Sequence, residues 1–92
     1  MIEEMDKLRK ALDDKGIAWW DESDDLIDRT KFEINGVRWS AINGLGTYGG
    51  IVNGSDHNQG LLEVWNNSIE EIGWLTAYDV IQMVSNVENN QC

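Results

Sequence analysis

The sequence predicts an α+β fold: a small antiparallel sheet of three to five strands flanked by an N-terminal and a C-terminal helix. Apolar residues recur at helical spacing near both ends, Asn-Gly separates two alternating runs, and short strand-like segments follow one another between the helices. Strands bracketed by helices are typical of α+β proteins. A chain of 92 residues is expected to form a single domain, residues 1–92.

The first element is an amphipathic helix. Ile2, Met5, Leu8 and Leu12 recur at spacings of three and four, with charged residues between them. Gly16 supplies the expected C-terminal stop. We expect the apolar stripe to pack into the core.

A short strand at residues 17–20 leads into an acidic segment, residues 21–28. Its opening resembles a calcium-binding loop, but such a loop needs glycine at its sixth position and glutamate at its twelfth, where this chain has Leu26 and Phe32. The segment is therefore predicted to be a solvated acidic turn without a metal. Its candidates for contact with a basic partner are Asp21, Glu22, Asp24 and Asp25.

Residues 31–34 and 37–42 are predicted to form a hairpin around Asn35-Gly36, because a type I′ turn needs positive φ at both central residues. Phe32 should share a face with Ile34, and Trp39 should share one with its apolar neighbours two residues away.

Further strands are expected at residues 61–65 and 69–75, and Thr76 is a suitable N-cap for the last helix. Two alternatives fit the buried face of that helix. One consists of Tyr78, Ile81 and Val84, and the other of Ala77, Val80, Val84 and Val87. Three of the five tryptophans are expected to lie mainly in the core, because a small domain needs large aromatic side chains there.

Between the predicted hairpin and the strand at residues 61–65 lies a glycine-rich stretch, residues 43–60, with six glycines and a single charged residue. Connections beyond roughly 12–15 residues are uncommon in compact domains and often functional. We interpret the stretch as a binding loop, with turns and bulges of a sheet as the alternative. Trp39, Tyr48, Trp65 and Trp74 are expected to line one concave face beside it. The candidate binding residues are Trp39, Asn43, Tyr48, Asp56 and His57.

No enzyme signature is evident. Residues 44–49 read G-x-G-x-x-G, but the glycines that follow oppose the helix that a dinucleotide site requires, and no lysine follows for a P-loop. His57 is the only histidine, which excludes a histidine metal cluster. We therefore predict no catalytic residue, no metal and no cofactor.

The charge narrows the choice of partner. The formal net charge is -10, from 17 acids and 7 bases, and no lysine or arginine occurs from Trp39 onward. Nucleic-acid binders neutralise phosphates with these bases, so direct nucleic-acid binding is disfavoured. Solubility alone is the simpler explanation of the acidic charge. If the charge serves a partner, the favoured partner is a host protein with a basic surface. No apolar run is long enough for a membrane span, so an intracellular protein is expected.

The strings WSAINGLGTYGG, LLE and GWLTAYDV, within residues 17–85, resemble small uncharacterised acidic proteins encoded by phages and mobile elements of Gram-positive bacteria. The resemblance implies a phage accessory protein in the cytoplasm of the host bacterium. Such proteins are often anti-defence inhibitors, of which anti-CRISPR proteins are one kind.

Two functions follow as expectations. The first is a non-enzymatic inhibitor that binds a host defence protein through an acidic, aromatic and glycine-rich surface. The alternative is sequestration of a small nucleotide signalling molecule, with loop amides gripping phosphate and Trp39 or Tyr48 stacking on a base. A homodimer is also predicted, because a small sheet has exposed edges that must be covered or paired.

Overall fold

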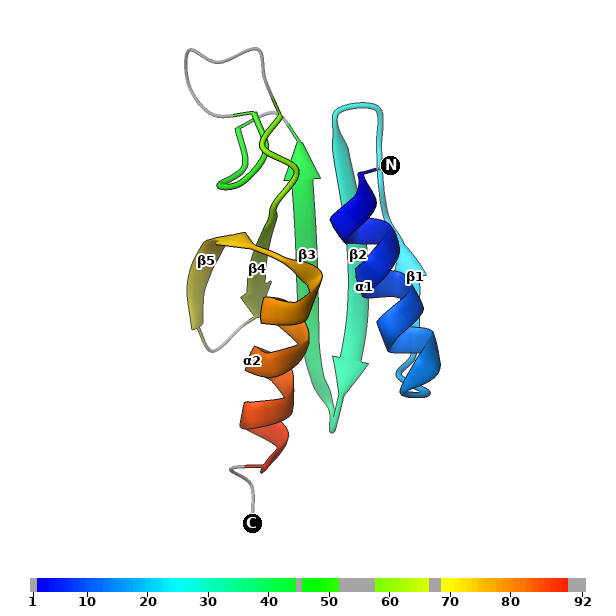
Figure 1. The fold of residues 1–92 in the computed structure, drawn as a ribbon. Helices are drawn as coiled ribbons and strands as arrows, with labels where there is room; N and C mark the ends of the chain where they lie inside the picture. The colour runs from blue at the N-terminus through cyan, green and yellow to red at the C-terminus, as the bar shows by residue number, and fades with distance from the viewer. Residues whose placement is uncertain (1, 45, 52–57, 67–68, 90–92) are drawn as a thin grey trace.

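The computed structural model describes residues 2–44, 46–51, 58–66 and 69–89, and it confirms the α+β fold (Figure 1). All five strands pair antiparallel in the order β1-β2-β3-β4-β5. The elements are α1 (Glu3–Asp14), β1 (Trp19–Asp21), β2 (Ile27–Ile34), β3 (Val37–Gly44), β4 (Leu62–Asn66), β5 (Ile69–Leu75) and α2 (Ala77–Asn89).

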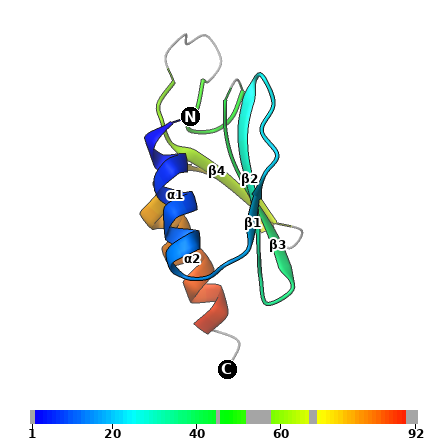
Figure 2. The same cartoon turned by 90° about the vertical axis from the view of Figure 1, so that its right-hand side faces the viewer.

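Both helices lie on the same face of the sheet, and Figure 2 shows the two layers edge-on. The core between the layers contains Met5, Leu8 and Leu12 of α1, Ala77, Val80, Ile81 and Val84 of α2, and Phe32, Trp39, Ala41, Leu62 and Val64 of the sheet. No described helix covers the opposite face. We call it the open face; its central cross-strand row is Trp20, Lys31, Ser40 and Trp65.

The β2–β3 hairpin confirms the prediction for the Asn-Gly turn. Asn35 has a φ of 52° and Gly36 a φ of 81°, as a type I′ turn requires. Phe32 pairs with Trp39 across the hairpin, and their rings stack with centroids 6.3 Å apart and planes 7° apart. The hairpin thus places two large aromatic rings under the helices.

The N-terminus of α2 is capped as the sequence predicts. Thr76 Oγ1 accepts a hydrogen bond from the Asp79 amide at 3.1 Å, and Asp79 Oδ2 accepts one from the Thr76 amide at 3.0 Å. Glu4 of α1 accepts a third bond, from the Ala77 amide at 2.8 Å, which ties the two helices together. In the described part of the chain, neither helix has the length and apolarity needed to cross a membrane.

The buried face of α2 combines residues from both predicted alternatives. Ala77, Val80, Ile81 and Val84 are buried, whereas Tyr78 is 70% exposed. The side chain of Val87 lies outside the described residues. The helix therefore turns its tyrosine away from the sheet.

The expectation of three core tryptophans is wrong. Only Trp39 is buried, at 2% exposure, while Trp19 and Trp20 are partly exposed and Trp65 and Trp74 are exposed. Because both helices cover one face, a tryptophan that alternation directs to the other face stays at the surface. Trp65 is in that position.

Burial predicts which leucines stabilise the fold. Leu8 is fully buried and Leu26 is 68% exposed. Leu8→Ala is expected to lower the free energy of unfolding by about 2–5 kcal/mol, because it leaves a cavity. The matched control Leu26→Ala should change it by less than about 0.5 kcal/mol. Chemical denaturation measures both, and equal losses would contradict the core described above.

Candidate functional site

The structure brings the two predicted functional segments together at one end of the molecule (Figure 1). β2 and β3 pair Ile27 with Gly44 and Asp28 with Asn43, so the acidic turn meets the start of the glycine-rich stretch. A Cβ on Gly44 would lie 2.4 Å from the carbonyl oxygen of Leu26. Glycine at position 44 therefore permits the close approach of the two segments.

A hollow of about 390 Å³ lies where these segments meet. We call this region the acidic end. The described residues of its lining include three carboxylates and no lysine or arginine. The lining consists of Asp24, Asp25, Leu26, Ile27, Asp28, Asn43, Gly44, Ile51 and Asn58.

Asp24 organises the turn at this hollow. Its Oδ1 accepts hydrogen bonds from the amides of Leu26 and Ile27, both at 2.9 Å. These bonds hold the pKa of the Asp24 carboxyl below its usual value, so it stays ionised. The same turn leaves the Leu26 side chain 68% exposed among the acids.

Asp21 and Glu22 are exposed but interact with groups of their own chain. Asp21 lies 3.3 Å from an Arg9 guanidinium nitrogen, and hydrogen bonding from the Ser23 hydroxyl and amide lowers its pKa to about 2. Glu22 accepts a hydrogen bond from the Trp20 indole, which is the main cause of its lowered pKa, and lies 3.3 Å from Lys31 Nζ. Of the four predicted partner-facing acids, only Asp24 and Asp25 line the hollow.

Asn43 was predicted to bind a partner, and the structure places it in the lining of the hollow but buries its side chain. Its side chain is 2% exposed, and its Nδ2 donates to the Leu61 carbonyl at 2.8 Å and to Asn58 Oδ1 at 3.1 Å. Asn58 Nδ2 donates back to Asn43 Oδ1 at 2.7 Å. The amide of Asn43 is thus engaged in holding the ends of the glycine-rich stretch together.

Close backbone contacts explain the glycines in the described part of the stretch. A Cβ on Gly50 would lie 2.4 Å from the Gly44 carbonyl oxygen, and one on Gly49 would lie 2.9 Å from the Leu61 carbonyl carbon. The Thr47 hydroxyl closes the turn: it accepts a hydrogen bond from the Gly44 amide at 3.0 Å and donates one to the Gly44 carbonyl at 2.9 Å. The alternative interpretation, turns within a sheet protein, therefore accounts for this part of the stretch.

The predicted aromatic face does not form. Trp39 is buried beneath the helices, whereas Trp65 belongs to the open face, because alternation along a strand separates the two faces. Tyr48 is 58% exposed, and its backbone is fixed by bonds from its amide to Glu63 Oε1 at 3.0 Å and from the Trp74 amide to its carbonyl at 3.1 Å. Trp39 is thus unavailable to a partner. Asp56 and His57 lie outside the described residues.

Several residues that line the hollow were not among the sequence candidates: Leu26, Asp28, Ile51 and Asn58. The role of Leu26 could have been predicted from the sequence, because it is an apolar residue within an acidic segment. Asp28 follows from the β2–β3 register, which single-sequence reasoning left open. Nothing in the local sequence indicates the contribution of Asn58.

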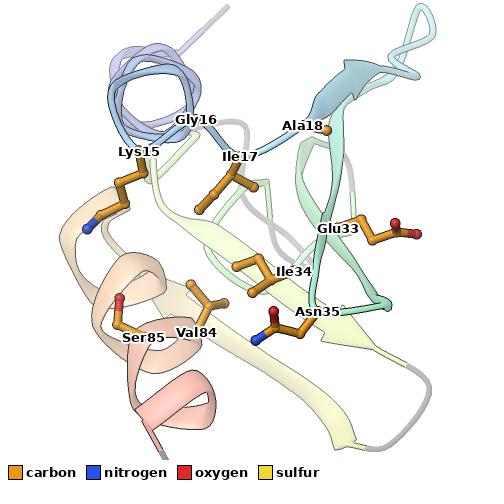
Figure 3. Close-up of a pocket in the computed structure, with 9 residues that line it drawn as sticks. All are labelled: Lys15, Gly16, Ile17, Ala18, Glu33, Ile34, Asn35, Val84 and Ser85. Atoms are coloured by element: carbon orange, nitrogen blue, oxygen red, sulfur yellow. The ribbon is translucent and has the colours of Figure 1, made fainter.

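A second hollow, of about 410 Å³, lies at the other end of the sheet and contains none of the predicted residues. The C-terminus of α1, the β2–β3 turn and α2 enclose it, with Ile17, Ile34 and Val84 pointing inward (Figure 3). Lys15 and Glu33 lie on opposite sides of it in Figure 3. Its charged groups do not converge on a common point, so the acidic end is the stronger candidate.

The chemistry available at the acidic end is attraction of cationic groups. Among the described residues, no three histidine, cysteine or acidic side chains are placed to hold a metal ion. Ionised carboxylates around an exposed leucine suit the side chains of lysine and arginine. The chain matches no protein-family model, no curated protein and no solved structure. The assignment of a function therefore rests on this geometry.

The close contacts predict different costs for two glycine substitutions. Gly50→Ala should reduce the free energy of unfolding by about 2–3 kcal/mol or more, because the new Cβ collides with the backbone of Gly44. Gly46→Ala meets no neighbouring atom and should cost only about 1 kcal/mol, for its positive φ of 81°. Thermal and chemical denaturation compare them; a smaller cost at position 50 would contradict the packed turn.

Asp21 gives a prediction for pH. Its pKa falls from 3.8 to about 2 in the folded chain, so its stabilising contribution is complete above the unfolded value and is lost as pH falls from about 4 to about 2. Ser23→Ala removes the largest cause and should raise the pKa toward 3.8. Carboxyl-carbon NMR titration measures both values. A wild-type Asp21 that titrates near 3.8 would argue against the contacts with Ser23.

Proposed function

We propose that this protein is a non-enzymatic binding protein that uses its acidic end to occupy a basic surface of a host defence protein and so inhibits it. One observation carries the proposal: the hollow at the acidic end gathers Asp24, Asp25 and Asp28 around an exposed leucine with no base in its described lining. The resemblance to phage accessory proteins supplies the biological context.

Electrostatics supports a basic partner. No lysine or arginine belongs to the described lining of the hollow, and Arg29 attracts Asp24 only at longer range, so a partner's cations would supply the missing charge. Arginine is the best match, since its guanidinium binds carboxylates through paired hydrogen bonds. Attraction between opposite potentials would also speed the encounter of the two proteins.

Leu26 adds an apolar contact to the charged contacts of the acidic end. Its side chain is exposed at the tip of the turn, and a well-packed apolar contact enclosed by polar groups is the usual form of an energetic centre in an interface. The hydrogen bonds from Leu26 and Ile27 to Asp24 already order the turn before binding. Less conformational entropy is then lost when the partner binds.

The described part of the glycine-rich stretch gives less support to the nucleotide alternative. Amides that would grip a phosphate already donate within the chain: those of Gly44, Gly46, Thr47, Tyr48, Gly50, Ile51, Gln59, Gly60 and Leu61. Trp39, one of the two rings expected to stack on a base, is buried in the core. A basic protein surface is the partner that this geometry favours.

Affinity capture with two matched triple variants tests the proposal. The first variant carries Asp24→Asn, Asp25→Asn and Asp28→Asn; the asparagine introduced at position 24 keeps the oxygen that orders the turn. The control carries Asp6→Asn, Asp14→Asn and Glu70→Gln, which remove the same charge from exposed sites elsewhere. From a Gram-positive host lysate, the wild type and the control should capture the same basic defence protein, and the first variant at least about tenfold less.

Titration of the captured protein with purified wild type gives the second measurement. Affinity should fall as salt rises from about 50 to 500 mM, since salt screens exposed charges. Equal capture by both triple variants would overturn the assignment of the acidic end. A captured protein whose activity is unaffected by saturating wild type would overturn inhibition.

A further inference from the structure

Although the chain is acidic overall, the open face carries positive as well as negative side chains. A hollow of about 280 Å³ at its centre is lined by Arg29, Lys31, Ser40, Ile42, Glu63, Trp65 and Glu71. The register places all of these side chains except Glu71 in two adjacent rows, Lys31–Ser40–Trp65 and Arg29–Ile42–Glu63. The face therefore combines an exposed indole with both signs of charge.

Among the residues that line this hollow, the two signs occupy opposite halves, although the β2 half of the open face also carries Glu33, which pairs with Arg38 of β3 at 3.2 Å. Arg29 and Lys31 lie on β2, Glu63 and Glu71 lie on β4 and β5, and the neutral Ser40 and Ile42 lie between them on β3. The order of strands preserves the division, because no lysine or arginine occurs after Arg38.

The cations on the β2 half remain available to a partner. Arg29 forms no ion pair within the described residues and attracts Glu22 and Asp24 only at longer range. Lys31 lies 3.3 Å from Glu22, but both side chains are substantially exposed. Exposed pairs of this kind contribute about 0–1 kcal/mol and exchange readily for other contacts.

We propose that the open face is the interface of a homodimer in which two copies pack sheet against sheet about a two-fold axis parallel to β3. Such an axis places the β2 half of each copy over the β4–β5 half of the other. Lys31 then lies over Trp65 of the other copy and within reach of the exposed Glu71. Arg29 lies over Glu63, which is only 9% exposed and already accepts a hydrogen bond from the Tyr48 amide, so Lys31 and Glu71 form the main charged contact. Each of these contacts occurs twice, as an isologous interface requires.

The proposed packing satisfies charge and aromatic contacts together. A lysine ammonium over an indole gives a cation–π interaction, and the opposite charges attract. Ile42 of each copy meets its equivalent near the axis, which gives the interface an apolar centre. Face-to-face packing of twisted sheets is a common arrangement with strands nearly aligned.

The size of the open face predicts a weak dimer. Five strands about 4.8 Å apart, with eight-residue strands at the centre, form a face of roughly 500 Å². Two such faces bury roughly 1,000 Å², near the lower limit for a specific interface. A dissociation constant in the micromolar range is therefore expected.

The sequence analysis predicts a homodimer because a small sheet has exposed edges. The proposed homodimer instead pairs the faces of the two sheets. β1 is only three residues long, and β5 carries Glu70 and Glu71 but no base. Two β5 edges paired antiparallel would bring these like charges close together, which is unfavourable. Complementary charge favours the face over the edge.

The axis has a consequence for the acidic end. Because it runs parallel to the strands, both copies present their acidic ends on the same side of the dimer. This dimer does not depend on the proposed function, but it would make the protein bivalent toward a repeated or dimeric partner.

Charge-reversal variants test the dimer by sedimentation velocity from about 10 to 500 µM. Lys31→Glu places like charge over Glu71 of the other copy, and Glu71→Lys places like charge over Lys31. Each variant alone should dimerise at least tenfold more weakly than wild type. An equimolar mixture should dimerise again, because the glutamate introduced at position 31 of one copy then faces the lysine introduced at position 71 of the other. Lys10→Glu, on the exposed surface of α1, is the matched control and should behave as wild type.

If either charge-reversal variant fails to fold, a substitution that changes no charge tests the dimer instead. Trp65→Ser removes an exposed indole from the open face and should also weaken the dimer at least tenfold. A wild type that stays monomeric at 500 µM would overturn the proposal. So would dimers of folded Lys31→Glu, Glu71→Lys or Trp65→Ser with wild-type affinity, or a mixture of the two reversals that stays monomeric.

Discussion

The fold depends on the stacked pair Phe32 and Trp39, which the Asn35-Gly36 turn places side by side beneath the two helices. These rings give the sheet one strongly apolar face, and the stripes of α1 and α2 both bury against it. Since two helices share that face, the other side of the sheet has no described helix to cover it. Burial of the hairpin aromatics thus determines which side chains remain at the surface and which surfaces a partner can contact.

The second constraint is close contact of backbone at one end of the sheet. The carbonyl of Leu26 lies so close to Gly44 that a Cβ at this position would collide with it. The acidic turn and the glycine-rich stretch can therefore line the same hollow. Asn43 and Thr47 then fix the start of that stretch by hydrogen bonds to its own backbone and to Asn58. The glycines nearest the sheet serve packing, and the exposed side chains in the described lining of the hollow are those of Asp24, Asp25 and Leu26.

Periodicity and turn chemistry were sufficient to predict both helices, the turn of the β2–β3 hairpin and the strands β4 and β5, because each of these signals is local. They did not predict that the hairpin strands extend to Ile27 and Gly44, beyond the predicted residues 31–34 and 37–42. The candidate site was predictable only in part. Asp24 and Asp25 were identified from composition, but their meeting with Asn43 depends on the strand register, which is a long-range property. Alternation showed that Trp39 and Trp65 are on particular sides of their strands; it did not show that both helices cover the same side. For that reason a core residue and an open-face residue were assigned to a single surface.

The central claim is that the acidic end, rather than the acidic surface in general, binds basic groups. Titration with a short oligo-arginine peptide, followed by amide NMR shifts, tests it most directly. The account predicts the largest shifts at residues 24–28 and at positions 43 and 44, with saturation at one peptide per chain. Shifts spread evenly over the acids, or concentrated on the α1 residues Asp6, Asp13 and Asp14, would contradict it.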